Sequence, residues 1–225
     1  MRYRYRLAPA PGQRQQLART FGCARVVFND ALRCREDARA AGERLRDSAI
    51  QSRVAAQAKR TPERAWLAAV SATALVQACG DARLAYRNWF ASRSGQRQGR
   101  RLGPPRFRSR KDRRQTFRLT RQSFALRPNG RLSLAKIGEV RVRWSRPLPS
   151  PPSSVTVIGE ADGRYYASFV VERAEAPFAP VQAEVGIDLG LERFLTTSQG
   201  TIVANPRPLR TRARKLAAAQ RALSR

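Results

Sequence analysis

The chain has 225 residues, of which 45 are Lys or Arg and 16 are Asp or Glu, so its formal net charge is +29 at pH 7. It contains no histidine, and its three cysteines form no CxxC pair, which excludes a Cys/His zinc site and a Cys-His catalytic pair. The charge indicates a polyanionic partner such as nucleic acid, because solubility alone needs far less.

The first ten residues alternate basic and apolar side chains. One face carries Arg2, Arg4 and Arg6, and the other carries the apolar residues. This period of two predicts a strand. The arginine face is either solvated or in contact with a nucleic-acid backbone, and the total charge favours contact.

After Pro11-Gly12 the apolar residues recur every three or four positions, which predicts helix. Gly22 interrupts this pattern, as a turn between two helices would. Any two core helices joined by glycine resemble a DNA-binding helix-turn-helix, so we interpret this part first as a core element. Residues 38–60 are polar and predicted to be irregular.

A long helix is predicted to begin at Thr61-Pro62-Glu63, where a capping hydroxyl precedes a proline at the first helical position. An apolar stripe with a spacing of four residues follows. Its members are Trp66, Val70, Ala74, Ala78, Ala82, Tyr86 and Phe90. We expect a helix of this length to pack against its neighbours along the stripe.

Residues 93–121 hold twelve bases and one acid, Asp112. Basic side chains neutralise phosphates and aromatic rings stack on bases, so this segment is the first candidate for nucleic-acid contact. The predicted contact residues are Arg106, Phe107, Arg108, Arg110, Lys111, Arg113, Arg114 and Arg118. A run of like charge is also typical of a disordered linker, which the glycines and prolines at 95–105 favour. The strand predicted at 116–120 favours order in the second half.

Residues 116–172 are predicted to be all β. Asn129-Gly130 marks a tight hairpin, and the strand at 155–158 pairs with 165–171. Five or six short strands predict a small β-barrel, which the first strand of the chain could complete. The helices at 12–92 would then be an insertion. Prolines between 177 and 180 predict a linker.

An apolar strand is predicted at residues 185–190, where Asp188 stands between two glycines. Ribonuclease H-like folds present the first ligand of a magnesium pair on a buried strand of this kind, so Asp188 is the predicted catalytic residue and metal ligand. Two divalent ions need several carboxylates. Beyond Asp188 the only acid is Glu192, which is too close in sequence to arrive from a separate element. The alternative is that Asp188 is simply a strand residue.

No sequence feature indicates a membrane protein. The longest apolar stretch, around residues 66–79, is too short and too polar to span a bilayer, and the amino terminus lacks an apolar signal region. We therefore expect a cytoplasmic protein with no membrane partner. Its three cysteines, Cys23, Cys34 and Cys79, are expected to be reduced packing residues.

Five segments together resemble the TnpB (OrfB-type) proteins of insertion sequences, which are RNA-guided DNA nucleases similar to type V CRISPR effectors. In chain order they are Phe21 to Arg25 with Asn29, Pro105 to Lys111, Asp162 to Phe169, Val185 to Gly190, and Ala204 to Arg207. The resemblance implies an α+β fold in three parts. A wedge-like β-barrel would comprise residues 1–10 and 116–181, and a helical recognition domain with a helix-turn-helix-like start would be inserted at 11–115. Residues 182–225 would form the first strands of a ribonuclease H-like (RuvC) domain.

The same resemblance implies a guide RNA and a double-stranded DNA target as partners. The family's later catalytic Glu and Asp and its four-cysteine zinc ribbon have no counterpart in this sequence, and only Asp188 is carried over. We therefore expect a truncated binding protein with an incomplete nuclease site, which holds magnesium weakly or not at all and has no zinc ligands. The alternatives are a poorly folding fragment, a plain basic RNA-binding protein, and an endonuclease completed by a separate C-terminal part.

Overall fold

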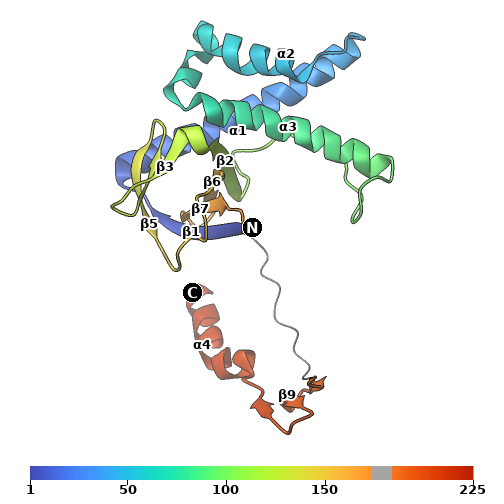
Figure 1. Cartoon of the computed structure of the whole chain (residues 1–225), viewed down its shortest axis with the longest axis vertical. Helices are drawn as coiled ribbons and strands as arrows, with labels where there is room; N and C mark the ends of the chain where they lie inside the picture. The colour runs from blue at the N-terminus through green and yellow to red at the C-terminus, as the bar shows by residue number, and fades with distance from the viewer. Residues whose placement is uncertain (174–183, 225) are drawn as a thin grey trace. The chain divides into compact units, whose positions relative to one another are not determined.

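A computed structural model of the protein describes residues 1–173 and 184–224. The chain forms two compact units, residues 1–174 and 175–225. The elements of the first unit are β1 (Arg2–Ala8), α1 (Pro11–Ala40), α2 (Asp47–Gln51), α3 (Ala72–Arg93), β2 (Arg114–Thr120), β3 (Phe124–Leu126), β4 (Arg131–Leu134), β5 (Gly138–Arg143), β6 (Ser154–Glu160) and β7 (Tyr165–Val170) (Figure 1). Helices and strands are both well represented, so the fold is α+β.

Seven strands form one antiparallel sheet in the order β2-β6-β7-β1-β5-β4-β3. The first strand of the chain lies in the middle of this sheet, between β7 and β5. Its burial alternates as predicted, since Tyr5 and Leu7 are buried while Arg2, Arg4 and Arg6 are exposed. The helices α1, α2 and α3 intervene between β1 and β2 in the sequence.

The sheet curves, but the strands that are described do not close into the predicted barrel. Phe124 of β3 reaches across to Phe169 of β7, with ring centroids 6.3 Å apart. The edge strands β2 and β3 are joined by a single turn at residues 121–123 and are not paired with each other. The hydroxyl of Ser123 in this turn bonds instead to Thr73 at the start of α3, at 2.6 Å. The turn between β2 and β3 therefore contacts α3, where closure of the barrel would have needed these two strands to pair.

The predicted turn at Gly22 is wrong, because α1 is one helix of 30 residues in which Gly22 has ordinary backbone angles. A glycine inside a helix costs about 1 kcal/mol relative to alanine, which tertiary packing readily outweighs. Phe21 supplies part of that packing. Its ring lies on β6, where a Cβ added to Gly159 would come within 3.1 Å of it.

The predicted helix start at Thr61 is also wrong. Residues 62–69 form 3-10 turns, and α3 begins only after an extended Val70. The Thr61 hydroxyl does not cap the following turn, because it donates a hydrogen bond back to the Ala58 carbonyl at 3.0 Å. The middle of the predicted stripe is buried from Val70 to Tyr86, whereas Trp66 is 42% exposed and Phe90 is 50% exposed.

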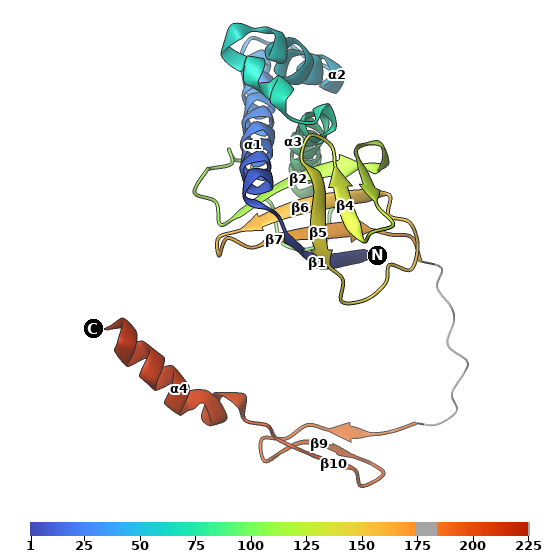
Figure 2. The same ribbon diagram turned by 90° about the vertical axis from the view of Figure 1, so that its left-hand side faces the viewer.

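Residues 38–60 are more regular than predicted. The helix α1 continues to Ala40, and α2 is followed by one π-helical stretch at residues 52–57. Ile50 and Val54 bury their side chains in the main core, which explains why this polar stretch is ordered. The short helix α2 lies at the end of α1 that is remote from the sheet (Figure 2).

The predicted hairpins are confirmed. β3 pairs with β4 across Asn129-Gly130, where Gly130 takes a φ of +73° that favours glycine. The Asn129 side chain accepts the Arg131 amide hydrogen at 3.0 Å. β6 pairs with β7 across residues 161–163.

The second unit contains β8 (Ile187–Asp188), β9 (Arg193–Thr197), β10 (Ile202–Ala204) and α4 (Pro208–Leu223). The strands form an antiparallel sheet in the order β10-β9-β8. The buried strand predicted around Asp188 is not observed, since Ile187 is 59% exposed and Leu189 is 67% exposed within this unit. Gly190 serves a tight turn, because a Cβ there would lie 3.1 Å from the Arg193 carbonyl oxygen. The linker predicted at 177–180 lies outside the described residues.

We predict that Gly22→Ala raises the free energy of unfolding by about 0.5–1 kcal/mol, because alanine is the better helix former. Nothing lies within 4 Å of the added Cβ. Gly163→Ala is the matched control: its Cβ also meets nothing, but its φ of +74° disfavours alanine, so stability should fall. Denaturant unfolding measures both. A loss of stability in Gly22→Ala would indicate a turn at this position.

Candidate nucleic-acid interface

The basic segment that follows α3 is held against α1 by one side chain, Asn29. Its amide nitrogen donates to the Arg108 carbonyl at 2.9 Å, and its amide oxygen accepts the Arg108 backbone N–H at 2.8 Å. Both backbone groups of Arg108 are therefore satisfied by one residue of α1, 79 positions earlier in the sequence. This pair of hydrogen bonds gives the segment around residue 108 a defined place instead of the linker behaviour considered above.

Two of the predicted contact residues share one acidic partner inside the protein, Asp81. Arg118 donates to Asp81 of α3 at 2.8 Å, and Arg108 lies 3.6 Å from the same carboxylate. The Arg108 guanidinium also stacks on the Phe28 ring, 3.7 Å from its centroid. Burial lowers the pKa of Arg108, while the charge of Asp81 opposes that effect. Arg108 and Arg118 are therefore tied into the fold and are less available to a ligand than their neighbours.

The single acid of the basic segment shapes a turn. Asp112 accepts the backbone N–H of Ser109 at 2.8 Å, and the Gln115 amide donates to the carbonyls of Ser109 and Asp112, both at 3.1 Å. The side chains of Arg110 and Arg113 are exposed around this turn. The acid thus orders the backbone that presents the two arginines.

A groove lies between the first half of α1, this turn and the β6–β7 hairpin. It consists of two cavities of about 540 and 300 Å³ that share Phe21, Arg25, Asp112 and Gln115. We call it the basic groove. Its cationic lining residues are Arg19, Arg25, Arg108, Arg110, Arg113 and Arg114. Gly22 forms part of the wall, so the α1 backbone is accessible there without an intervening side chain.

A second basic surface is the outer face of the sheet, which we call the arginine face. Arg2, Arg4 and Arg6 of β1 lie on it, as predicted, together with Arg143 of β5, which is paired directly with Arg6. Arg131 and Arg141 form a second opposed pair across β4 and β5. Like charges directly opposite on antiparallel strands destabilise the sheet. An anion bound on this face would reduce that repulsion.

One carboxylate connects the two surfaces. Glu160 accepts a hydrogen bond from Arg4 at 2.7 Å and lies 3.9 Å from Arg114. Arg4 also stacks on the Tyr166 ring, 3.9 Å from its centroid. These two predicted contact residues therefore lie beside each other, at the place where the basic groove meets the arginine face.

The other predicted residues of the segment are exposed. Arg106 and Lys111 have no ion-pair partner in the part of the chain that the structure describes. The ring of Phe107 is 49% exposed, with the Arg33 guanidinium 5.6 Å from its centroid. A stacking contact with a base is sterically open to Phe107.

Sequence reasoning missed Arg19, Arg25 and the β5 arginines. Arg19 and Arg25 are six residues apart on a helix that was interpreted as core, and their place in the groove depends on the distant turn at Asp112. The alternation from Val140 to Arg143 was a usable signal, because the arginines occupy every second position of a predicted strand. The register that places Arg143 beside Arg6 was not available from the sequence.

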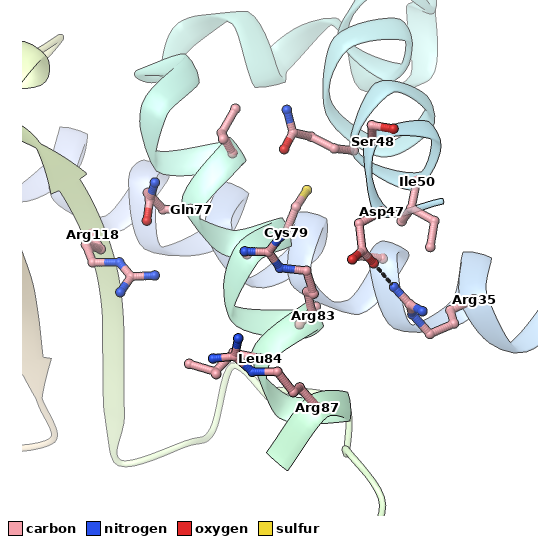
Figure 3. Close-up of a pocket in the computed structure, with 15 residues that line it drawn as sticks. Arg35, Asp47, Ser48, Ile50, Gln77, Cys79, Arg83, Leu84, Arg87 and Arg118 are labelled. Atoms are coloured by element: carbon pink, nitrogen blue, oxygen red, sulfur yellow. Dashed lines mark hydrogen bonds and ion pairs between the residues drawn. The ribbon is translucent and has the colours of Figure 1, made fainter. Parts of the chain in front are cut away.

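A separate pocket of about 370 Å³ lies between α1, α2, α3 and β2 (Figure 3). Arg35 forms an ion pair with Asp47 at its edge, and Arg83 and Arg87 of α3 also line it. Cys79 lies in the wall, where burial raises the pKa of its thiol to about 12. A thiol with so high a pKa stays protonated at neutral pH and is a poor nucleophile.

The structure does not build a metal centre around Asp188. The residue is exposed, and among the described residues no group of three or more His, Cys, Asp or Glu side chains could hold a metal ion. A magnesium pair needs several carboxylates, so the described residues do not fit one, and we assign no catalytic step to Asp188. Its role as a metal ligand stays a prediction.

Another segment that resembles the TnpB family, Ala204 to Arg207, has a structural role in the second unit. The Asn205 amide donates to the Leu191 carbonyl at 2.8 Å, and the same side chain accepts the Arg207 amide hydrogen at 3.0 Å. Asn205 thereby ties the chain that enters α4 to the loop that follows Asp188.

Two family profiles match the chain. Residues 1–44 match a profile of the IS605 OrfB type described as "Helix-turn-helix domain", and residues 168–225 match one described as "Probable transposase". The chain belongs to the IS605 OrfB transposase family. In this OrfB protein the first profile covers β1 and the uninterrupted α1, so the described residues contain no turn between two helices there.

The relatives of this OrfB protein are longer. A "Putative RNA-guided DNA endonuclease" of Streptomyces pristinaespiralis is 40% identical over 99% of the chain and 54% of its own length. "Putative RNA-guided DNA endonuclease InsQ" of Escherichia coli K12 is 29% identical over 99% of the chain and 53% of its length. A "Putative RNA-guided DNA endonuclease" of Mycobacterium tuberculosis is 28% identical over 99% of the chain and 55% of its own length. The chain spans about half the length of these curated relatives.

Among the described residues, none of the helices combines the length and the apolar character that a membrane-spanning helix needs.

We predict that Asp81→Asn lowers the free energy of unfolding by about 1–3 kcal/mol, because Arg108 and Arg118 both lose their charged partner. Asp162→Asn is the control. Asp162 pairs with Arg164 at a site where both side chains are at least half exposed, so its loss should cost under about 1 kcal/mol. Denaturant unfolding distinguishes the two. Equal effects would show that Asp81 does not hold the two arginines.

Proposed function

We propose that this OrfB protein binds a guide RNA and its double-stranded DNA target through the basic groove and the arginine face, and that residues 1–225 alone do not cleave the DNA. The observation that carries the proposal is the basic groove itself. Arg19, Arg110 and Arg113 line it without an acidic partner among the described residues. Asp112 and Glu160 also line the groove, but its six arginines outnumber them, so a positive balance remains for phosphates.

The chemistry of these side chains suits a nucleic-acid backbone. The planar guanidinium fork matches phosphate oxygens in a bidentate arrangement, which a lysine ammonium does not. In RNA-guided recognition, base pairing reads the sequence while the protein holds the backbone and a short flanking motif. An arginine-lined surface is therefore what such a protein needs. The names of the relatives, putative RNA-guided DNA endonucleases, support the same proposal.

The proposal that this chain does not cut follows from Asp188. A phosphodiester nuclease with two metal ions needs several carboxylates in one place, and the described residues offer Asp188 without such a group. Loss of cleavage does not abolish targeting, because binding and cleavage depend on different parts of such proteins. A chain that binds without cutting would mask or repress its target site.

A second candidate is an endonuclease completed by further polypeptide. The exposed apolar side chains of the second unit favour it: Ile187, Leu189 and Phe194 are all at least half exposed. Apolar surface of this extent marks an interaction site or an aggregation liability. If further strands covered it, Asp188 would lie on a buried strand, as the sequence first indicated.

We predict that Arg110→Ala/Arg113→Ala weakens binding to RNA and to duplex DNA and reduces its salt dependence. Two lost phosphate contacts should lower the slope of log affinity against log salt by about 1.4 for a single strand and about 1.8 for a duplex. Fluorescence anisotropy at several salt concentrations measures both slopes.

The control for this variant is Arg53→Ala/Arg60→Ala, which removes the same charge from exposed sites in the helical stretch that follows α2. Its slopes should match those of the wild-type protein. A groove variant with wild-type slopes would refute the assignment of the interface. If both variants lose the same slope, binding is a diffuse effect of net charge.

Purification of the protein with its nucleic acid separates the alternatives. One discrete bound RNA supports a guide, whereas a heterogeneous RNA population supports a plain RNA-binding protein. Addition of magnesium and target DNA should give no specific cut. Specific cleavage that is abolished by Asp188→Ala would contradict the proposal and show that residues 1–225 complete a nuclease site.

A further inference from the structure

A large pocket outside the basic groove lies between the C-terminal ends of α1 and α3. Its volume is about 740 Å³. We call it the distal pocket and define it by Arg39, Arg44, Trp89, Phe90 and Arg93, all of which line it. Neither the basic groove nor the arginine face includes any of these residues.

The distal pocket has an aromatic wall. The rings of Trp89 and Phe90 lie 4.8 Å apart, and Tyr86 lies 6.3 Å from Phe90 in a stacked arrangement. Tyr86 is buried and donates its hydroxyl hydrogen to Glu36 at 3.3 Å, which anchors the cluster. Phe90 was expected on the buried stripe of α3, yet half of it is exposed. The cluster therefore presents an open ring at the pocket.

Cations line the pocket beside this aromatic cluster. The Arg93 guanidinium lies 5.7 Å from the Trp89 ring centroid, while Arg39 and Arg44 have no acidic partner among the residues that the structure describes. Two acids, Glu36 and Glu43, also line the pocket, and Glu36 already accepts the Tyr86 hydroxyl. The neighbouring Arg35 is occupied by Asp47 (Figure 3). The three other arginines give the pocket a positive balance.

An exposed ring with cations beside it is the arrangement that holds bases of a single strand. Stacking on the ring needs an unpaired base, because the faces of a paired base are covered by its neighbours in the duplex. The arginines supply the contacts to the flanking phosphates. A purely apolar partner is disfavoured, since burial against it would leave the guanidinium groups without compensation.

We propose that the distal pocket binds one unpaired nucleobase of a single-stranded nucleic acid by stacking on Phe90, with the adjoining phosphates held by Arg39, Arg44 or Arg93. This inference rests on the nucleic-acid binding proposed above. It adds a contact in which the distal pocket binds a base of the strand, whereas the basic groove binds phosphates.

The test compares Phe90→Ala with the wild-type protein on four probes of about 12 nucleotides, a length typical of single-strand sites. They are single-stranded RNA, single-stranded DNA of the same sequence, an abasic strand and the DNA duplex. Phe90→Ala should weaken binding to a base-bearing single strand roughly 5- to 100-fold, the range for the loss of one stacked base. Binding to the abasic strand and to the duplex should not change.

Phe90→Tyr keeps the ring and should retain wild-type affinity, whereas Phe90→Leu keeps apolar bulk without a ring and should lose affinity as Phe90→Ala does. Trp66→Ala is the control, because Trp66 is also exposed beside an arginine but does not line the pocket. Equal losses of affinity for single-stranded RNA and DNA, or a loss for RNA alone, would each support base stacking. The comparison of the two also shows which kind of strand the pocket binds.

Two results would overturn the proposal. Either Phe90→Ala leaves single-strand affinity unchanged, or it weakens the abasic strand equally, which would indicate a structural effect. If Arg110→Ala/Arg113→Ala weakens binding while Phe90→Ala does not, the proposal for the distal pocket is refuted and the proposed function is retained. If the wild-type protein binds no nucleic acid, both proposals are refuted.

Discussion

The two hydrogen bonds between the Asn29 side chain and the Arg108 backbone fix the arrangement on which the proposed interface depends. They join the middle of α1 to a segment whose composition alone is typical of a linker. Once Arg108 is held, the turn at Asp112 and the start of β2 follow within a few residues. The basic groove lies between this segment, α1 and the β6–β7 hairpin, so that contact holds one of its walls in place.

The distribution of acids explains which arginines are available to a ligand. Asp81 pairs with two arginines and Glu160 with two more, so a few carboxylates neutralise the cations that the fold needs. Many of the other described arginines are exposed, and some stand directly opposite one another, as Arg6 and Arg143 do. A protein that retains such opposed charges loses stability unless an anion offsets them. The excess charge is therefore more consistent with a ligand than with solubility.

Local patterns in the sequence were sufficient for the strands but not for the helices. The alternation at residues 1–10 predicted the strand β1, and Asn129-Gly130 predicted the β3–β4 hairpin, because these signals act within a few residues. The course of α1 through Gly22 depends on distant packing that no local pattern reveals. Around the basic groove, the arginines of the segment at 106–114 were singled out from composition, whereas Arg19 and Arg25 of α1 were not. The pairing of Arg108 with Asp81 was not, since α3 and the basic segment meet only in the fold.

Hydrogen exchange at the Arg108 amide in the free protein tests the central claim most directly. The amide donates to Asn29, so it should exchange far more slowly than the amides of a disordered peptide, and Asn29→Ala should remove that protection. The Phe117 amide, in β2 opposite Val157 of β6, is an internal reference that should stay protected in both proteins. Unprotected exchange at Arg108 in the wild-type protein would contradict the account, because the basic segment would then be a mobile linker and the groove would not exist before a ligand binds.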